Sequence, residues 1–162
     1  MKLYIKQKVF TIRDKFDVTD ANRQIVYKVK GDFLSIPPKI RIFDGNDKEL
    51  FVLRRKLLSL FPQYSVFQND QEVATIKQKF AMMKKVFEIE CKYGRIDLTG
   101  NIFALNFKLM IQDKEVASIN KALISFGDSY EINIAEGYET GLMTAIVLAI
   151  DNALHNEQSR AR

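Results

Sequence analysis

Apolar and polar residues alternate along most of the chain, which is the pattern of β-strands with one buried face. Between residues 86 and 93, Phe87, Ile89, Cys91 and Tyr93 fall on one face and mostly charged residues on the other. Polar turn clusters separate such runs, and each is flanked by strand-forming residues, at 44–47, 68–71 and 112–114. The pattern therefore predicts about twelve short strands joined as hairpins.

The predicted hairpins repeat. Residues 66–76 match residues 109–119 closely, and apolar residues recur at the same offsets with a period of about 20 to 24 residues. One hairpin with its connection has that length, so the chain is a series of related β-units. A series of hairpins must hide its outer edges, and closure into a barrel removes them. We therefore expect one closed barrel without an internal linker.

A single helix is predicted at residues 139–154, and it is apolar on nearly every side. Such a helix must be buried on almost all faces, so we expect the strands to surround it. Its apolar stretch, residues 142–150, is about half of the roughly 20 residues that a membrane-spanning helix needs. The sequence thus predicts one domain over residues 1–157, a mainly β closed barrel of about twelve antiparallel strands around this helix, with a disordered tail at 158–162.

Composition narrows the functional classes without selecting one. The 162 residues are 47% hydrophobic and 28% charged, with a net charge of +5 and a pI of about 9.2. A dedicated nucleic-acid binder concentrates its charge more, so no nucleic-acid partner is expected. One cysteine excludes an internal disulfide and fits a reducing compartment. The start of the chain has no uninterrupted apolar run of the signal-peptide type, so we expect a cytoplasmic protein.

The helix carries one polar stripe, formed by Thr140, Thr144, Asp151 and His155. Asp151 and His155 are four residues apart, so they could act as a base or a proton switch at the mouth of the barrel. The alternative is structural: Asp151 bonds polar groups near the rim and His155 stabilises the end of the helix. We favour the structural interpretation, because a base without a nucleophile or an oxyanion donor is not a mechanism.

Other catalytic chemistry has little support in the sequence. Cys91 lies on an apolar strand face, so we expect a buried and inert thiol. One His and one Cys do not form a metal site, and no phosphate-binding glycine motif is present. No cofactor and no metal are therefore expected.

Two basic clusters stand beside apolar residues in adjacent repeats. They are Arg54, Arg55 and Lys56 in one unit, and Lys84 and Lys85, preceded by Lys77 and Lys79, in the next. Apolar residues adjoin both, namely Leu57, Leu58, Leu60 and Phe61, and Phe80, Met82 and Met83. Cations beside apolar loop tips suit an anionic membrane surface, where each basic residue contributes about 1 kcal/mol. The simpler alternative is that the apolar residues cap the end of the barrel while the cations are solvated.

Two segments of the chain resemble a known family. Residues 55–64 (Arg-Lys-Leu-Leu-Ser-Leu-Phe-Pro-Gln-Tyr) precede a hairpin, and residues 127–134 (Gly-Asp-Ser-Tyr-Glu-Ile-Asn-Ile) precede the helix that continues through Ala149, Ile150 and Asp151. Both are similar to the bacterial LURP-one-related family. The resemblance implies the Tubby C-terminal-like fold, a closed twelve-stranded antiparallel barrel around a central helix, with phospholipid scramblases as distant relatives. It implies no catalytic residues. Tubby domains bind phosphoinositide headgroups through Lys and Arg, and none of those positions is carried over to a residue of this chain.

The first functional hypothesis is a non-enzymatic intracellular module that binds anionic phospholipid and is peripheral to the membrane. Its candidate ligand-binding residues are Arg54, Arg55, Lys56, Lys84 and Lys85. The alternative is a protein-interaction or scaffold domain, since the fold is complete without a catalytic constellation. An enzyme using Asp151 and His155 ranks last. The sequence leaves the oligomeric state open.

Overall fold

A computed structural model describes residues 1–6, 15–32, 34–82, 84–121 and 129–158, with the backbone alone for Lys85, Ser129 and residues 155–158. This part of the chain forms twelve strands and one helix. The elements are β1 (Lys2–Lys6), β2 (Lys15–Thr19), β3 (Ile25–Asp32), β4 (Lys39–Asp44), β5 (Glu49–Arg55), β6 (Gln63–Gln68), β7 (Gln71–Ala81), β8 (Lys84–Cys91), β9 (Gly94–Asn101), β10 (Asn106–Ile111), β11 (Lys114–Lys121), β12 (Ser129–Ile134) and α1 (Thr140–Gln158).

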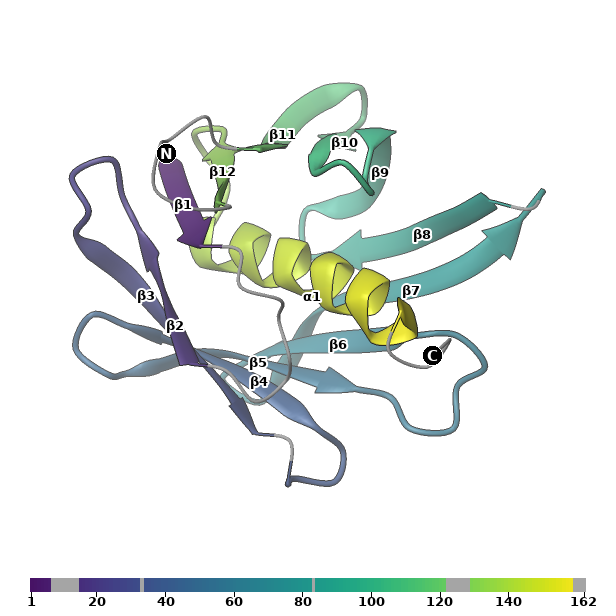
Figure 1. Ribbon diagram of the computed structural model, residues 1–162, viewed down its shortest axis with the longest axis horizontal. Helices are drawn as coiled ribbons and strands as arrows, with labels where there is room; N and C mark the ends of the chain where they lie inside the picture. The colour runs from purple at the N-terminus through teal and green to yellow at the C-terminus, as the bar shows by residue number, and fades with distance from the viewer. Residues whose placement is uncertain (7–14, 33, 83, 122–128, 159–162) are drawn as a thin grey trace.

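The strands form a closed barrel in which each pairs antiparallel with its neighbours in sequence. The ring closes where β1 pairs with β12, with Leu3 opposite Ile132, and with β2 on its other side. Helix α1 passes through the interior of this ring (Figure 1). The predicted fold, a twelve-stranded antiparallel barrel with a buried helix, is confirmed.

Because the strands run alternately up and down, their connections fall at two ends. The turn end holds residues 20–24, 45–48, 69–70, 92–93 and 112–113, with residues 135–139 leading into α1. The loop end holds the longer connections, of which residues 34–38, 56–62, Met82 and 102–105 are described. Helix α1 begins at the turn end, and the hairpin of β7 and β8 extends past its C-terminal end (Figure 1).

The turn end has the tight hairpins that the polar clusters predict. Asn69 and Asp70 have φ of 50° and 62°, and Gln112 and Asp113 have φ of 48° and 61°. Two consecutive residues with positive φ make the turn whose twist matches that of the flanking strands. The carboxylate of Asp44 accepts hydrogen bonds from the backbone N–H groups of residues 46 and 48, both at 2.9 Å. The turn residues thus satisfy their own polar groups.

The repeat is also visible in the structure. The residues that recur in the sequence pattern point into the barrel, with Ile42, Val66, Ile89, Leu109 and Ile132 each 0% exposed. Four of the strand pairs carry a register shift at the equivalent position, beside Val18, Ile42, Val66 and Leu109. Equivalent interior positions and equivalent bulges indicate that the barrel is made of one structural unit used repeatedly.

Helix α1 fills the barrel. Every residue from Leu142 to Leu154 is at most 6% exposed. Gly141 lets the helix lie close to β5, since a Cβ at that position would stand 2.5 Å from the ring of Phe51. The helix is longer than predicted and includes Gln158, which the sequence assigned to the tail. Residues 155–158 are polar, so they carry no apolar pattern, yet His, Asn, Glu and Gln all continue a helix once it has been nucleated.

The wall is not uniform between β8 and β9. Eight residue pairs join β7 to β8, up to the pair of Ala81 and Lys84. Three pairs join β8 to β9, and the last toward the loop end is Ile89 with Ile96. Beyond it the two strands separate, as Figure 1 shows, with β8 following β7 outward and β9 curving toward β10.

Candidate functional site

The candidate basic residues lie at the loop end. Arg54 and Arg55 end β5, Lys56 follows them, and Lys84 begins β8, while the side chain of Lys85 is outside the described part. The two connections that carry them touch each other. The rings of Phe61 and Phe80 stack with their centroids 6.5 Å apart, and the backbone N–H of Gln78 donates to the carbonyl of Pro62 at 2.9 Å. The barrel therefore brings the two predicted clusters to neighbouring positions.

The first cluster is divided between the two faces of β5. Arg54 lies on the outside, with its guanidinium 4.3 Å from the centre of the Phe67 ring. Arg55 follows the alternation of Phe51 and Leu53, which point inward, so it stands at the mouth of the barrel. Arg54 and Arg55 thus do not form one patch, because successive strand residues point to opposite faces.

In the described part of the chain, the candidate cations have no acidic partners, a property that they share with several other lysines of the barrel, such as Lys39 and Lys48. Among the described side chains, none of Arg54, Arg55, Lys56 and Lys84 forms an ion pair. Lys79 is the contrast: its ammonium contacts the Glu88 carboxylate at 2.5 Å, and this hydrogen bond lowers the pKa of Glu88. Lys79 is therefore neutralised on the barrel wall, whereas the cations nearest the loop end carry uncompensated charge.

Exposed apolar side chains gather at the same end. The described part has eleven large apolar side chains that are exposed, and nine of them are at the loop end; Met1 and Ile25 are the other two. The nine are Leu34, Ile36, Leu57, Leu58, Leu60, Phe80, Met82, Val86 and Phe103. The fold does not bury them, so the prediction that the apolar residues cap the barrel is wrong for these tips.

Two of the tips are held in an unfavourable backbone conformation. Leu58 has φ of 57° and Met82 has φ of 48°, and both side chains are almost fully exposed. A non-glycine residue in the left-handed region costs about 1 kcal/mol or more, and Asn or Asp tolerates it best. The tight turns at the other end use Asn69, Asp70 and Asp113 at such positions. The exposed side chains of Leu58 and Met82 bury no apolar surface in exchange.

The polar stripe of the helix has a structural role where it is described. The hydroxyl of Thr140 bonds that of Tyr27, and the hydroxyl of Thr144 donates to the carbonyl of Thr140 at 2.8 Å. Asp151 is 3% exposed, and burial first and the charge of Asp151 second raise the pKa of Tyr130 well above its usual range. The side chain of His155 is outside the described part, so the pair that it forms with Asp151 stays a prediction.

Cys91 is less buried than predicted. It stands at intermediate exposure, with its sulfur 3.4 Å from the carbonyl of Gly94, and burial raises the pKa of its thiol. A raised pKa keeps the thiol protonated and poorly nucleophilic, as expected for an inert cysteine. Within the described residues, no three His, Cys, Asp or Glu side chains are grouped closely enough to hold a metal ion.

Comparison with known proteins decides the family. The family model described as LURP-one-related matches residues 1–151. The chain belongs to the LURP-one-related family. It is 30% identical over 161 residues to the uncharacterized protein YxjI of Bacillus subtilis (strain 168), covering 99% of this chain and 98% of that protein. An X-ray structure of an Arabidopsis thaliana protein is similar in fold, with a TM-score of 0.69 at 16% identity over 93% of this chain and 89% of that chain.

These comparisons confirm the expected LURP-one-related family and its fold. Neither the family nor these two relatives assigns an activity, so the function has to be argued from the surface of this LURP-one-related barrel. No helix in the described part of the chain combines the length and the hydropathy needed to cross a bilayer. The features left to explain are the apolar tips and the unpaired cations at the loop end.

Proposed function

We propose that the protein is a non-enzymatic binding module that docks its loop end on an anionic phospholipid surface and is peripheral to the membrane. The observation that carries the proposal is the concentration of exposed apolar side chains at one end, on connections without a carboxylate. Residues 34–38, 56–62, Met82 and 102–105 contain no Asp or Glu. A surface that combines apolar side chains with unpaired cations suits a lipid layer, which has negatively charged headgroups over an apolar acyl region.

The energetics favour two kinds of contact acting together. Arg55, Lys56 and Lys84 would each contribute about 1 kcal/mol near an anionic leaflet. An aliphatic side chain such as Leu58 or Leu60 gains roughly 1.5–3 kcal/mol when it leaves water completely, and less when it inserts in part. Neither term alone gives stable attachment. Their sum gives reversible binding that weakens as salt screens the charges.

The arrangement of the tips favours a lipid layer over a protein partner. The most exposed tips, Ile36, Leu58, Leu60 and Met82, belong to three separate connections. A fluid layer accepts side chains that stand at different heights, whereas a protein interface needs a matched and well-packed surface. A scaffold domain remains the alternative, and binding to a protein without binding to vesicles would select it.

Sedimentation of the full chain with vesicles tests the proposal. We expect the protein to sediment with phosphatidylcholine vesicles that contain phosphatidylglycerol, less so at physiological than at low salt, and not with phosphatidylcholine alone. Lys56→Glu should reduce this binding. Lys114→Glu makes the same charge change at the turn end and is the matched control. Equal and negligible sedimentation with both kinds of vesicle would overturn the proposal, as would equal effects of the two variants.

A further inference from the structure

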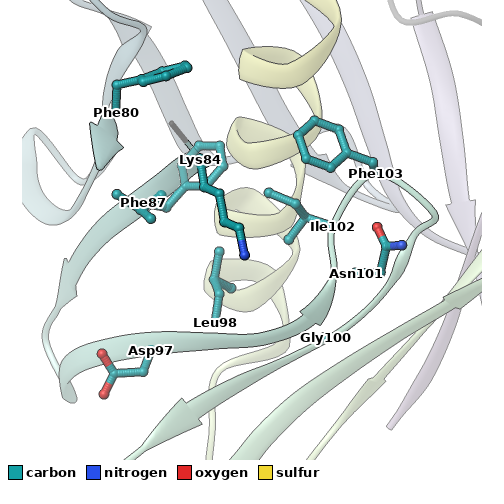
Figure 2. A pocket seen from close by; sticks show the side chains of 10 residues that line it. Phe80, Lys84, Phe87, Asp97, Leu98, Gly100, Asn101, Ile102 and Phe103 are labelled. Carbon is teal, nitrogen blue, oxygen red and sulfur yellow. The ribbon is translucent and has the colours of Figure 1, made fainter. Parts of the chain in front are cut away.

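The separation of β8 and β9 opens a pocket near the loop end. Its volume is about 760 Å³, and it lies between the β7–β8 hairpin on one side and β9 with the start of the next connection on the other (Figure 2). Small-molecule sites in proteins have about 300–1,000 Å³ and are mostly apolar. The pocket thus has the size of a ligand site and is separate from the polar stripe of the helix.

Apolar side chains form both the floor and the rim. Phe87, Leu98 and Ile102 are partly buried and pack against the barrel core, so the floor is continuous with the hydrophobic interior. Phe80 and Phe103 stand at the rim and are 55% and 63% exposed. Figure 2 shows Leu98, Ile102 and Phe103 directed toward the space between the two sides. Water in such a hollow has few polar side chains to bond.

One cation reaches into this apolar space. The side chain of Lys84 extends across the pocket toward Leu98 (Figure 2), and among the described residues its ammonium has no carboxylate partner. Asp97, the acidic residue of the lining, points away from Lys84 in Figure 2 and accepts a hydrogen bond from Arg95 at 3.3 Å. The pocket therefore offers one free positive charge beside an apolar hollow.

The strand edges add donors for an anion. The pairing of β8 with β9 stops at Ile89, so the β9-facing N–H groups of residues 84–88 have no partner on that strand. A backbone N–H is a strong donor that seeks an acceptor. A ligand with one negatively charged oxygen group and an apolar body would use both the ammonium of Lys84 and this edge.

We propose that this pocket binds one molecule of a free long-chain fatty acid, with its carboxylate at Lys84 and its acyl chain against Phe87, Leu98 and Ile102. A single lysine balances a single negative charge, whereas a phosphate monoester carries nearly two at neutral pH. The volume suits one chain. The two proposals share Lys84, but this one uses the pocket floor and a monomeric ligand, so it does not require docking on a lipid surface.

Titration calorimetry with the full chain, below the concentration at which the ligands form micelles, tests the proposal. Hexadecanoate should bind, dodecanoate more weakly by about fourfold for each buried methylene lost, and butanoate not at all. Hexadecan-1-ol, which has the chain without the charge, should bind more weakly than hexadecanoate. Absence of hexadecanoate binding, or binding independent of chain length, would overturn the proposal.

Three variants locate the site. Ile102→Trp fills the hollow and should lower the affinity for hexadecanoate about tenfold or more, and Phe103→Ser, at the exposed rim, should lower it even if the first variant does not fold. Lys84→Met should lower it about fivefold and leave the affinity for hexadecan-1-ol unchanged. Lys114→Met, the same change at the turn end, is the control. Binding that survives both Ile102→Trp and Phe103→Ser, or that Lys84→Met and Lys114→Met change equally, would contradict the assignment.

Vesicle sedimentation separates this inference from the proposed function. Ile102→Trp should lower the affinity for hexadecanoate about tenfold or more and leave sedimentation with anionic vesicles unchanged, because Ile102 is partly buried and is not one of the nine exposed apolar side chains of the loop end. If the wild-type chain bound hexadecanoate but did not sediment with anionic vesicles, the proposed function would be overturned and the pocket proposal would stand. Fatty-acid uptake seen only when vesicles are present would overturn the pocket.

Discussion

The two ends of the barrel are built on the same strands and differ in their connections. At the turn end, the non-glycine residues in the left-handed region are all polar, namely Arg23, Asp47, Asn69, Asp70, Gln112 and Asp113. The same connections hold six carboxylates, those of Asp20, Asp47, Asp70, Asp113, Glu136 and Glu139. At the loop end, the described connections contain no carboxylate, and the non-glycine residues with positive φ are the exposed Leu58 and Met82 and the buried Leu105. The turn end thus has the polar residues that are typical of stable, solvent-exposed turns, whereas the loop end has apolar residues at such positions.

The difference between the two ends shows which connections have residues suited to the stability of their turns. A turn needs residues that tolerate positive φ and bond their own backbone, and the turn end has them. The exposed side chains of Leu58 and Met82 bury no apolar surface within the barrel, and the proposed docking on a lipid surface would account for them. Both ends depend on the same hydrophobic interior. A substitution that disrupts this interior should therefore destabilise both ends equally.

The largest effect is expected from a charge in the shared interior. Ile146 is 0% exposed, so Ile146→Asp buries a carboxylate without a partner and should lower the free energy of unfolding by about 4 kcal/mol or more. Ile36→Asp makes the same change at the loop end, where the side chain is 86% exposed, and should leave stability nearly unchanged. Urea denaturation followed by circular dichroism measures both, and equal midpoints would contradict the buried helix.

The apolar tips should separate binding from stability. Leu58→Ser combined with Leu60→Ser should lower partition into anionic vesicles about tenfold, while unfolding changes by less than about 0.5 kcal/mol. Ile25→Ser removes an exposed apolar residue at the turn end and is the control. If the control weakened vesicle binding as much as the double variant, the two ends would not differ in function.

A smaller effect distinguishes the two neighbouring arginines. Arg55→Gln should weaken vesicle binding about fivefold, because it removes one charge worth about 1 kcal/mol at the mouth of the barrel. Arg54→Gln should weaken binding less and should lower stability by about 0.5–1 kcal/mol, because it removes the cation from the Phe67 ring. Sedimentation and thermal melting of the same two proteins test this, and identical behaviour would argue against their placement on opposite faces.

The smallest effect concerns the turn end and pH. Glu139 accepts hydrogen bonds from Lys92 and Gln68, and the bond to Glu139 raises the pKa of Lys92. A raised pKa in the folded state stabilises the fold below the ordinary lysine pKa of about 10.4, and this contribution is lost as the pH rises through the raised value. Glu139→Gln should therefore reduce stability by less than about 1 kcal/mol near neutral pH, since the pair is partly exposed. The difference from wild type should shrink above about pH 10.4, and a difference that grew there would show the sign to be wrong.

The sequence predicted the parts of the barrel that depend on local pattern. Alternation located the strands, polar clusters located the tight hairpins, and the apolar segment 139–154 identified the buried helix. The basic clusters lie in adjacent repeats of the sequence, and the contact of Phe61 with Phe80 joins the two connections beside them.

The sequence did not predict the separation of β8 and β9, because this feature depends on how residues on different strands pair. The repeat implies a uniform wall, whereas β8 and β9 separate beyond Ile89. That opening arises because β8 follows β7 for eight pairs, which alternation within one strand does not reveal. Gly100 in β9 and the polar or small residues around it were the available signal, since they weaken the strand pattern just before Ile102 and Phe103.

The buried helix also constrains how the protein is made. The helix follows all twelve strands in the chain, and closure pairs Leu3 of β1 with Ile132 of β12. The seam therefore cannot form until β12 has been synthesised, and the interior cannot be filled until the helix has been synthesised. On the ribosome, the nascent chain therefore carries strands whose apolar faces are not yet covered by the helix. Folding should be late, slow and all-or-none, and newly made chains should depend on chaperones more than the small size of the protein suggests.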